Sequence, residues 1–106
     1  MKKVFGKSQS GIFSNVVVER LEDGSVYIYH TGEEDMHVKI CKKDLRSFGI
    51  GSWTKVRDFM YIEYAGGIIL EKFEDDSYGL DNPKGSGYVS FGEDYEKVFE
   101  YVRSLA

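Results

Sequence analysis

The sequence predicts an α+β domain in which a single twisted antiparallel sheet of five to six strands carries a C-terminal helix on one face. Three observations favour this fold. Apolar and polar residues alternate along most of the chain, with turn-forming dipeptides between the alternating segments. One strong helical repeat occurs near the C-terminus. A length of 106 residues with 42% hydrophobic residues fits a single domain, residues 1–106, with one core.

The first hairpin is expected over residues 15–30, where the dipeptide Asp-Gly at 23–24 suits a tight turn with positive φ. Alternation in its second strand directs Val26 and Ile28 toward the core, and Tyr27 and Tyr29 away from it. A polar turn at residues 31–35 then leads to a third strand at residues 37–41.

The second hairpin is expected over residues 54–74, with a Gly-Gly turn at 66–67. One parity carries Ile62 and Tyr64, while the opposite parity carries Tyr61 and Glu63. Between the hairpins, residues 42–48 are compatible with a short helix that Gly49 ends or with a loop, and we expect the helix.

The C-terminal third is expected to contain a long loop, a short strand and the helix. Residues 75–87 hold the only proline and have the composition of a loop. Residues 88–91 form the last strand, and residues 93–105 form the helix. Its apolar stripe consists of Tyr95, Val98, Phe99, Val102 and Leu105.

Two segments of the chain echo each other faintly. HVKICKKDLRSF at 37–48 and YVSFGEDYEKVF at 88–99 both predict a strand, polar residues and an amphipathic turn, and each follows a hairpin. Two strand-rich units that each end in a helix resemble the plan of the Pur-type repeat, which implies single-stranded nucleic-acid binding.

Composition and charge restrict the classes of function. The chain has 14 Lys and Arg against 18 Asp and Glu, so it lacks the general basic character of most phosphate-binding proteins. A local basic segment around Lys39 leaves nucleic acid open, but an acidic surface more readily meets a basic protein. Cys41 is the only cysteine, and we expect a soluble, cytoplasmic protein without a signal or membrane segment.

We expect no metal, cofactor or catalytic residue. His30 and His37 enclose three carboxylates, but their spacing matches no common ligand pattern, so a solvated turn is expected there. For the Cys41 thiol, no histidine with an orienting acid can be placed nearby from sequence, so we expect a tolerated thiol and no enzyme activity.

KGSGYVSF, residues 84–91, resembles the octapeptide signature of RNA-recognition motifs. The resemblance implies that Tyr88 faces outward and stacks on a base, while Val89 and Phe91 anchor the strand under the helix. The chain departs from the family at Ser86, which replaces an aromatic residue, and in lacking a long helix between the first two strands. A glycine-rich loop that leads into a strand explains the same residues without any ligand.

The aromatic content of 15% favours a recognition surface on the sheet. We therefore expect a non-enzymatic module that binds a protein partner, of the inhibitor, immunity or anti-defence type, through an aromatic sheet face and acidic turns. Its expected binding residues are Tyr27, Tyr29, Trp53, Tyr61, Glu33, Glu34, Asp35, Asp75 and Asp76. The alternative is a domain that binds single-stranded RNA or DNA through Lys84, Tyr88, Lys72 and Lys39, with Tyr27 and Tyr61 as further stacking rings.

Overall fold

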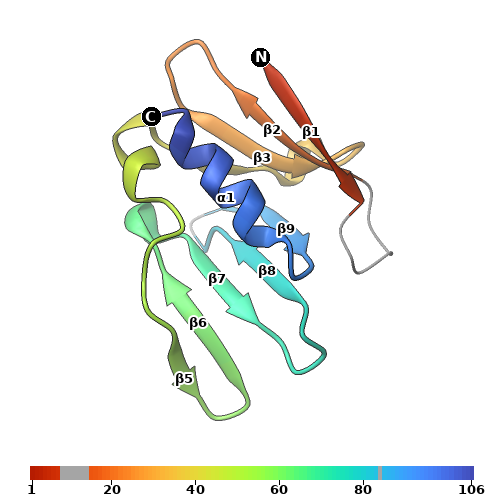
Figure 1. Cartoon of the computed structure of the whole chain (residues 1–106), viewed down its shortest axis with the longest axis vertical. Coiled ribbons are helices and arrows are strands. Elements are labelled where there is room, and N and C mark those ends of the chain that lie inside the picture. Colours follow the sequence, from red (N-terminus) through yellow and green to blue (C-terminus); the bar gives the residue numbers. More distant parts are fainter. Residues whose placement is uncertain (8–14, 84) are drawn as a thin grey trace.

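The computed structural model describes residues 1–7, 15–83 and 85–106, which form nine strands in two antiparallel sheets and one α-helix (Figure 1). Sheet A contains, in spatial order, β1 (Lys2–Lys7), β2 (Asn15–Arg20), β3 (Val26–His30) and β4 (Val38–Ile40). Sheet B contains β5 (Thr54–Val56), β6 (Phe59–Glu63), β7 (Ile69–Lys72), β8 (Tyr78–Asp81) and β9 (Tyr88–Phe91). The helix is α1 (Tyr95–Ser104), and the 3-10 helices are η1 (Glu34–Met36), η2 (Lys42–Ser47) and η3 (Ala65–Gly67).

The α+β class, the antiparallel pairing and the C-terminal helix are confirmed, and the segment at 42–48 is helical as expected. The single sheet of five to six strands is corrected to two sheets with four and five strands. Three strands were missed for identifiable reasons. Lysines crowd β1, an edge strand where charged side chains reach water, and β8 lies inside the expected loop at 75–87. A two-residue turn at 57–58 divides the expected long strand into β5 and β6.

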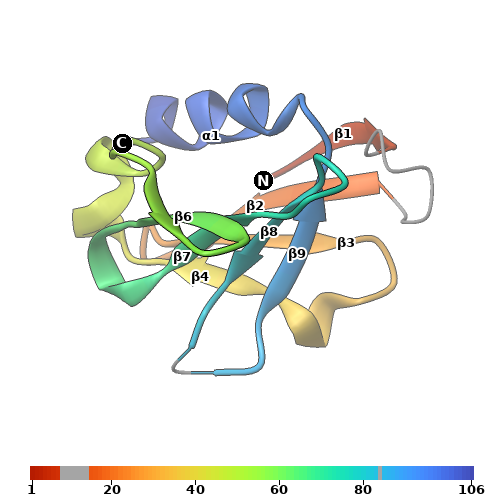
Figure 2. The same cartoon turned by 90° about the horizontal axis from the view of Figure 1, so that it is seen from below.

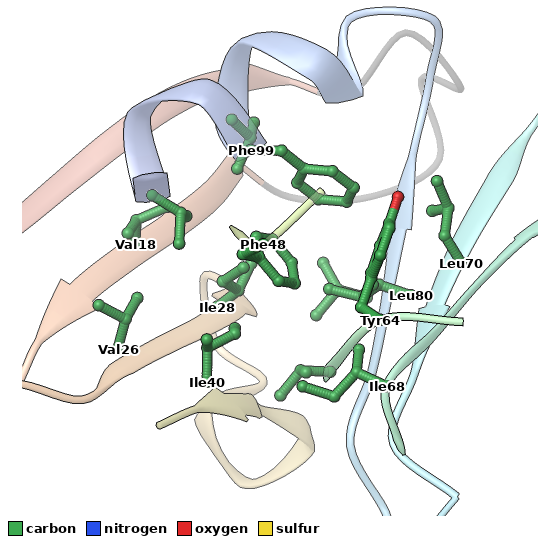
Figure 3. Packing of buried hydrophobic residues seen from close by; sticks show 14 of the residues in the cluster. Val18, Val26, Ile28, Ile40, Phe48, Tyr64, Ile68, Leu70, Leu80 and Phe99 are labelled. Carbon is green, nitrogen blue, oxygen red and sulfur yellow. The ribbon is translucent and has the colours of Figure 1, made fainter. Parts of the chain in front are cut away.

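Both sheets and α1 enclose one core. Figure 2 shows α1 lying across one side of the two sheets, and Figure 3 shows side chains from both sheets meeting beneath it. The core contains Val18, Val26, Ile28 and Ile40 from sheet A, Ile62, Leu70, Leu80 and Val89 from sheet B, and Val98, Phe99 and Val102 from α1. Burying one such side chain contributes roughly 1.5–3 kcal/mol, so each sheet depends on the other for most of its stability. Within the described residues, no helix has the length and apolar character that crossing a membrane would need.

The two sheets meet where β9 passes the end of β3 and the start of β4. The Ser90 backbone N–H donates a hydrogen bond to His30 Nε2 at 3.1 Å. Gly87 lies against the backbone of His37, and a Cβ at Gly87 would stand only 2.1 Å from the His37 carbonyl oxygen. The expected solvated turn is therefore wrong for His30, which is 3% exposed and joins the two sheets.

Three hairpin turns share one pattern of backbone hydrogen bonds. In each, the first residue's N–H bonds to the carbonyl four residues on, and the fourth residue has positive φ. The turns are residues 21–25, 64–68 and 73–77, and their positive-φ residues are Gly24, Gly67 and Asp76. The first and third turns also share an aspartate that accepts the N–H of a serine two residues on, at 2.9 Å for Ser25 and 3.0 Å for Ser77.

The chain contains the same structural plan twice. Strands β1–β4 form an antiparallel sheet that η2 follows, and strands β6–β9 form another that α1 follows. Phe48 and Phe99, which occupy the same position in the two echoing segments, meet in the core with ring centroids 4.7 Å apart. Strand β5 is an additional edge strand without a counterpart among the described residues of the first half. As far as the two halves are described, the second carries one more strand and an α-helix where the first has a shorter 3-10 helix.

Candidate functional site

Each sheet has an outer face, turned away from the shared core. On sheet A the strand register places Lys2, Glu19, Tyr27 and Lys39 side by side on that face. The charges and rings there have partners within the protein. Glu19 lies 4.0 Å from the Lys2 amine and accepts a hydrogen bond of 2.7 Å from the Tyr29 hydroxyl. The Tyr27 ring stacks on His37, with ring centroids 3.9 Å apart.

The outer face of sheet B combines aromatic rings with carboxylates. Because side chains alternate along a strand, the register places Tyr61 beside Glu71, and Asp81 between Ile69 and Tyr88. The residues of this acidic aromatic face are Phe59, Tyr61, Glu63, Glu71, Asp81 and Tyr88. The end of the sheet that carries Phe59 extends beyond α1 (Figure 1), and Phe59 is 41% exposed.

The Tyr88 ring lies across the sheet over Gly79 of the neighbouring strand. A Cβ at Gly79 would stand 2.3 Å from the Tyr88 hydroxyl oxygen and 2.8 Å from ring atom Cζ, so only glycine leaves room for the ring. The Tyr88 ring is half-buried as a result. At the other end of the face, the Phe59 and Tyr61 rings are 6.2 Å apart. Rings therefore occupy both ends of the face, and the carboxylates lie between them.

The carboxylates of this face lack a compensating cation. Burial, followed by the charge of Asp81, raises the pKa of Glu71 above its ordinary value. Burial also raises the pKa of Tyr88, with further contributions from the charges of Glu71 and Asp81. None of the described residues on this face is a lysine or arginine. Glu19, at the corresponding place in sheet A, has Lys2 beside it. The strand residues of this face therefore include three carboxylates and, among the described residues, no basic side chain.

The structure distributes the nine expected partner-binding residues over several surfaces. Tyr61 lies on the acidic aromatic face, whereas Tyr27 and Tyr29 belong to sheet A, where Tyr29 is 3% exposed. Trp53 is half-buried and packs against the core. The acidic residues Glu33, Glu34 and Asp35 lie in the exposed turn after β3, and Asp75 and Asp76 lie in the exposed turn between β7 and β8.

The residues of the nucleic-acid alternative do not share one surface. Tyr88 points outward from sheet B, as the resemblance implies, with Val89 and Phe91 buried beneath it. The register places Lys72 on the opposite side of that sheet, with its amine 3.8 Å from the Asp76 carboxylate. Lys39 is on sheet A, and Lys84 lies outside the described residues.

Four members of the acidic aromatic face were absent from the expected binding residues: Phe59, Glu63, Glu71 and Asp81. Asp81 lies within the segment that was expected to be a loop. The alternation within one strand does not show which residues flank Glu71 on the neighbouring strands, where the structure places Tyr61 and Gly79. Among the described residues, no group of three or more His, Cys, Asp or Glu side chains could hold a metal ion. Comparisons with protein-family models, curated proteins and solved structures gave no match.

Proposed function

We propose that this protein is a non-enzymatic binding module whose acidic aromatic face receives a basic segment of a partner protein. One observation carries the proposal: three carboxylates, Glu63, Glu71 and Asp81, lie among partly exposed rings with no described cation on the same face. Rings provide stiff apolar contact area at low entropic cost, and carboxylates select lysine or arginine. A module of this kind fits an inhibitor, immunity or anti-defence protein that covers a basic site.

The raised pKa of Glu71 supports a cationic partner in particular. A carboxylate that is partly buried beside another carboxylate is less stable in its ionised form than a solvated one. A lysine or arginine brought to within ion-pair distance would reverse that effect and lower the pKa of Glu71. The binding free energy then includes relief of a repulsion that exists in the free protein.

The same carboxylates argue against a nucleic acid on this face. Glu71 and Asp81 act on the Tyr88 phenol, so a phosphate near a base stacked on Tyr88 would meet the same negative potential. Two of the proposed phosphate-contacting lysines, Lys39 and Lys72, lie on other surfaces. Single-stranded nucleic acid remains the competing function, carried by the outward position of the Tyr88 ring, and the experiment below distinguishes it.

The test is to titrate isotope-labelled protein with a short oligo-arginine peptide and, separately, with a mixed-sequence single-stranded oligonucleotide at low salt. We expect the peptide to shift backbone amide signals of β6–β9 and the oligonucleotide to shift none of them. Glu71→Gln and Asp81→Asn should each weaken peptide binding about threefold, since each removes one charge from the face. Glu22→Gln removes an equal charge from the exposed turn before β3 and should leave binding nearly unchanged.

Two results would contradict the proposal. One is equal weakening by Glu71→Gln and Glu22→Gln, which would mean that the peptide responds only to net charge. The other is oligonucleotide binding that shifts the amide of Tyr88 and falls steeply with added salt, which would favour the nucleic-acid function.

A further inference from the structure

A cavity of about 310 Å³ lies between α1 and the segment at 49–53, on the side of sheet B opposite the acidic aromatic face. Its walls include the rings of Trp53, Tyr64 and Tyr95. Glu96 and Glu100, one helical turn apart on α1, also line it, and both are exposed. The Tyr95 hydroxyl donates a hydrogen bond of 3.3 Å to the Glu96 carboxylate.

A buried polar group of one lining residue, Tyr64, has no hydrogen-bond partner among the described residues. Tyr64 is 4% exposed, and its buried hydroxyl makes no hydrogen bond with any described residue. The charged or ionisable groups that act on its phenol are Tyr95, Arg103 and Glu96, all of which line the cavity. Figure 3 shows the Tyr64 ring rising toward α1 with the hydroxyl at its far end. A buried hydroxyl without a partner is destabilising, so a ligand that bonds to it gains affinity.

The charges around the cavity favour a cation. Glu96 and Glu100 contribute two negative charges, and Arg103 contributes one positive charge, for a net charge of −1. Arg103 Nη1 donates to the Phe48 carbonyl oxygen at 2.8 Å, which holds that guanidinium at the η2 side of the cavity. No described carboxylate forms an ion pair with Arg103. Arg103 therefore offsets one of the two negative charges in the sum without contacting either glutamate as an ion pair.

The aromatic wall continues past the cavity and already holds a cation. Trp53, Tyr78 and Tyr95 follow one another, with ring centroids 6.2 Å apart for Trp53–Tyr78 and 4.4 Å apart for Tyr78–Tyr95. The Lys72 amine lies 5.9 Å from the Tyr78 ring centroid, within the range of a cation–π contact. Rings of this kind beside carboxylates form a suitable site for an organic cation.

We propose that this cavity is a second binding site, which takes the guanidinium or alkylammonium head of an organic cation. The head contacts the rings of Trp53 and Tyr95, donates a hydrogen bond to the Tyr64 hydroxyl oxygen and faces Glu96 and Glu100. The site is separate from the acidic aromatic face and does not depend on the function proposed for it.

Trp53 makes the test direct because it is the only tryptophan in the chain. The probes are ethylguanidinium, n-butylammonium and, as a neutral compound of similar shape, ethylurea. We expect the two cations to change tryptophan fluorescence saturably and ethylurea to have no effect. Glu96→Gln and Glu100→Gln should each weaken cation binding about threefold. Tyr64→Phe should weaken it about fivefold.

Glu22→Gln is the matched control, because it removes the same charge from the exposed turn before β3, outside both proposed sites, and should leave the fluorescence titration unchanged. No saturable response to either cation would overturn the proposal, as would equal responses to ethylguanidinium and ethylurea. The proposal also fails if Glu22→Gln weakens binding as much as Glu96→Gln does. None of these results concerns the amide shifts of β6–β9, so the two proposals fail independently.

A second arm identifies the source of the cation. The dissociation constant of an oligo-arginine peptide is measured in the same fluorescence titration. If the peptide binds at least tenfold more tightly than ethylguanidinium, the cation belongs to a side chain of a partner protein. If the affinity per arginine side chain equals that of ethylguanidinium, the ligand is a free small cation. A third result is possible, in which the peptide shifts the amide signals of β6–β9 but neither the peptide nor ethylguanidinium changes tryptophan fluorescence. That result would refute the cavity site and leave the proposal for the acidic aromatic face intact.

Discussion

Removing the hydroxyl of Tyr64 is expected to stabilise the protein. The hydroxyl is hydrated in the unfolded chain, whereas in the folded protein it is buried without a partner among the described residues. Tyr64→Phe removes that penalty and keeps the ring. The edge-on contacts with Phe48, at 5.3 Å between centroids, and with Phe99, at 6.1 Å, remain in place.

The size of the effect follows from two opposing terms. An unpaired buried hydroxyl costs about 1–3 kcal/mol. The void left by one oxygen, roughly 10 Å³ at 24 cal/mol per Å³, costs about 0.2 kcal/mol. With the lower end of the first range, the gain from removing the hydroxyl exceeds the cost of the void by about 1 kcal/mol. We therefore expect the free energy of unfolding to rise by about 1 kcal/mol and the Tm by about 4 °C.

Tyr29→Phe is the matched control, since Tyr29 is equally buried and its hydroxyl has a partner. That hydroxyl donates to the Glu19 carboxylate at 2.7 Å, so its loss should lower the free energy of unfolding by about 1.5 kcal/mol. Burial, together with the bond to Glu19, raises the pKa of Tyr29 to about 12. Above about pH 10 the unfolded chain loses this proton while the folded chain keeps it, so stability falls as the pH rises through that window. The Tyr29→Phe variant should show a shallower alkaline decline.

Urea unfolding, followed by circular dichroism and by tryptophan fluorescence, measures both variants on one scale. Coincident transitions and unchanged m-values establish that the comparison is two-state. The reasoning predicts opposite signs for two identical chemical changes at two equally buried tyrosines. A loss of stability in Tyr64→Phe similar to that in Tyr29→Phe would refute it, because the Tyr64 hydroxyl would then have a partner in solution.

Three further pairs of substitutions test the backbone, the contact between the sheets and the packing of the Tyr88 ring. Arg57 has a φ of 51°, so Arg57→Gly should raise the free energy of unfolding by about 0.5–1 kcal/mol in urea melts, and Gly66→Ala, at a φ of 84°, should lower it. His30→Phe leaves the Ser90 N–H unpaired and should cost about 2 kcal/mol in the same assay, while His30→Gln retains an acceptor and should cost less. Gly79→Ala places a methyl group against the Tyr88 ring and should cost about 1–2 kcal/mol, whereas Gly85→Ala meets only an ordinary contact of 3.7 Å and should be nearly neutral. Equal losses at 79 and 85 would contradict the packing of the Tyr88 ring.

Local signals in the sequence were sufficient for the hairpins and the helix. The Asp-Gly and Gly-Gly dipeptides mark turns whose glycines do have positive φ. The apolar stripe of residues 95–105 is the side of α1 that enters the core. Parity also placed Tyr27 and Tyr61 on the faces away from α1, because their neighbours Ile28 and Ile62 are buried. These features depend on residues close together in the chain.

The missing features depend on residues that are far apart. The strand β8 contains Gly79, which indicates a turn until the Tyr88 ring is seen to fill the space above it. His30 lies beside a polar turn in the chain, and only the passage of β9 makes it a buried acceptor. The acidic aromatic face is assembled from four strands, so no single segment reveals that Glu71 and Asp81 act on each other. The division into two sheets was missed for the same reason. Alternation of apolar and polar residues predicts which face of a strand is buried, but it does not predict which strands pair with each other.

The two halves of the chain share a core contact but differ in the charges on the outer faces of their sheets. Each half buries a phenylalanine of its helical segment, Phe48 directly after η2 and Phe99 within α1, and the two rings pack on each other. The outer faces are under no such constraint, yet Glu19 has a lysine and a tyrosine hydroxyl beside it while Glu71 has a second carboxylate. Burial and the Asp81 charge both disfavour the ionised form of Glu71 in the free protein, as its raised pKa records. The basic partner proposed above would supply the positive charge that is missing beside Glu71 and Asp81.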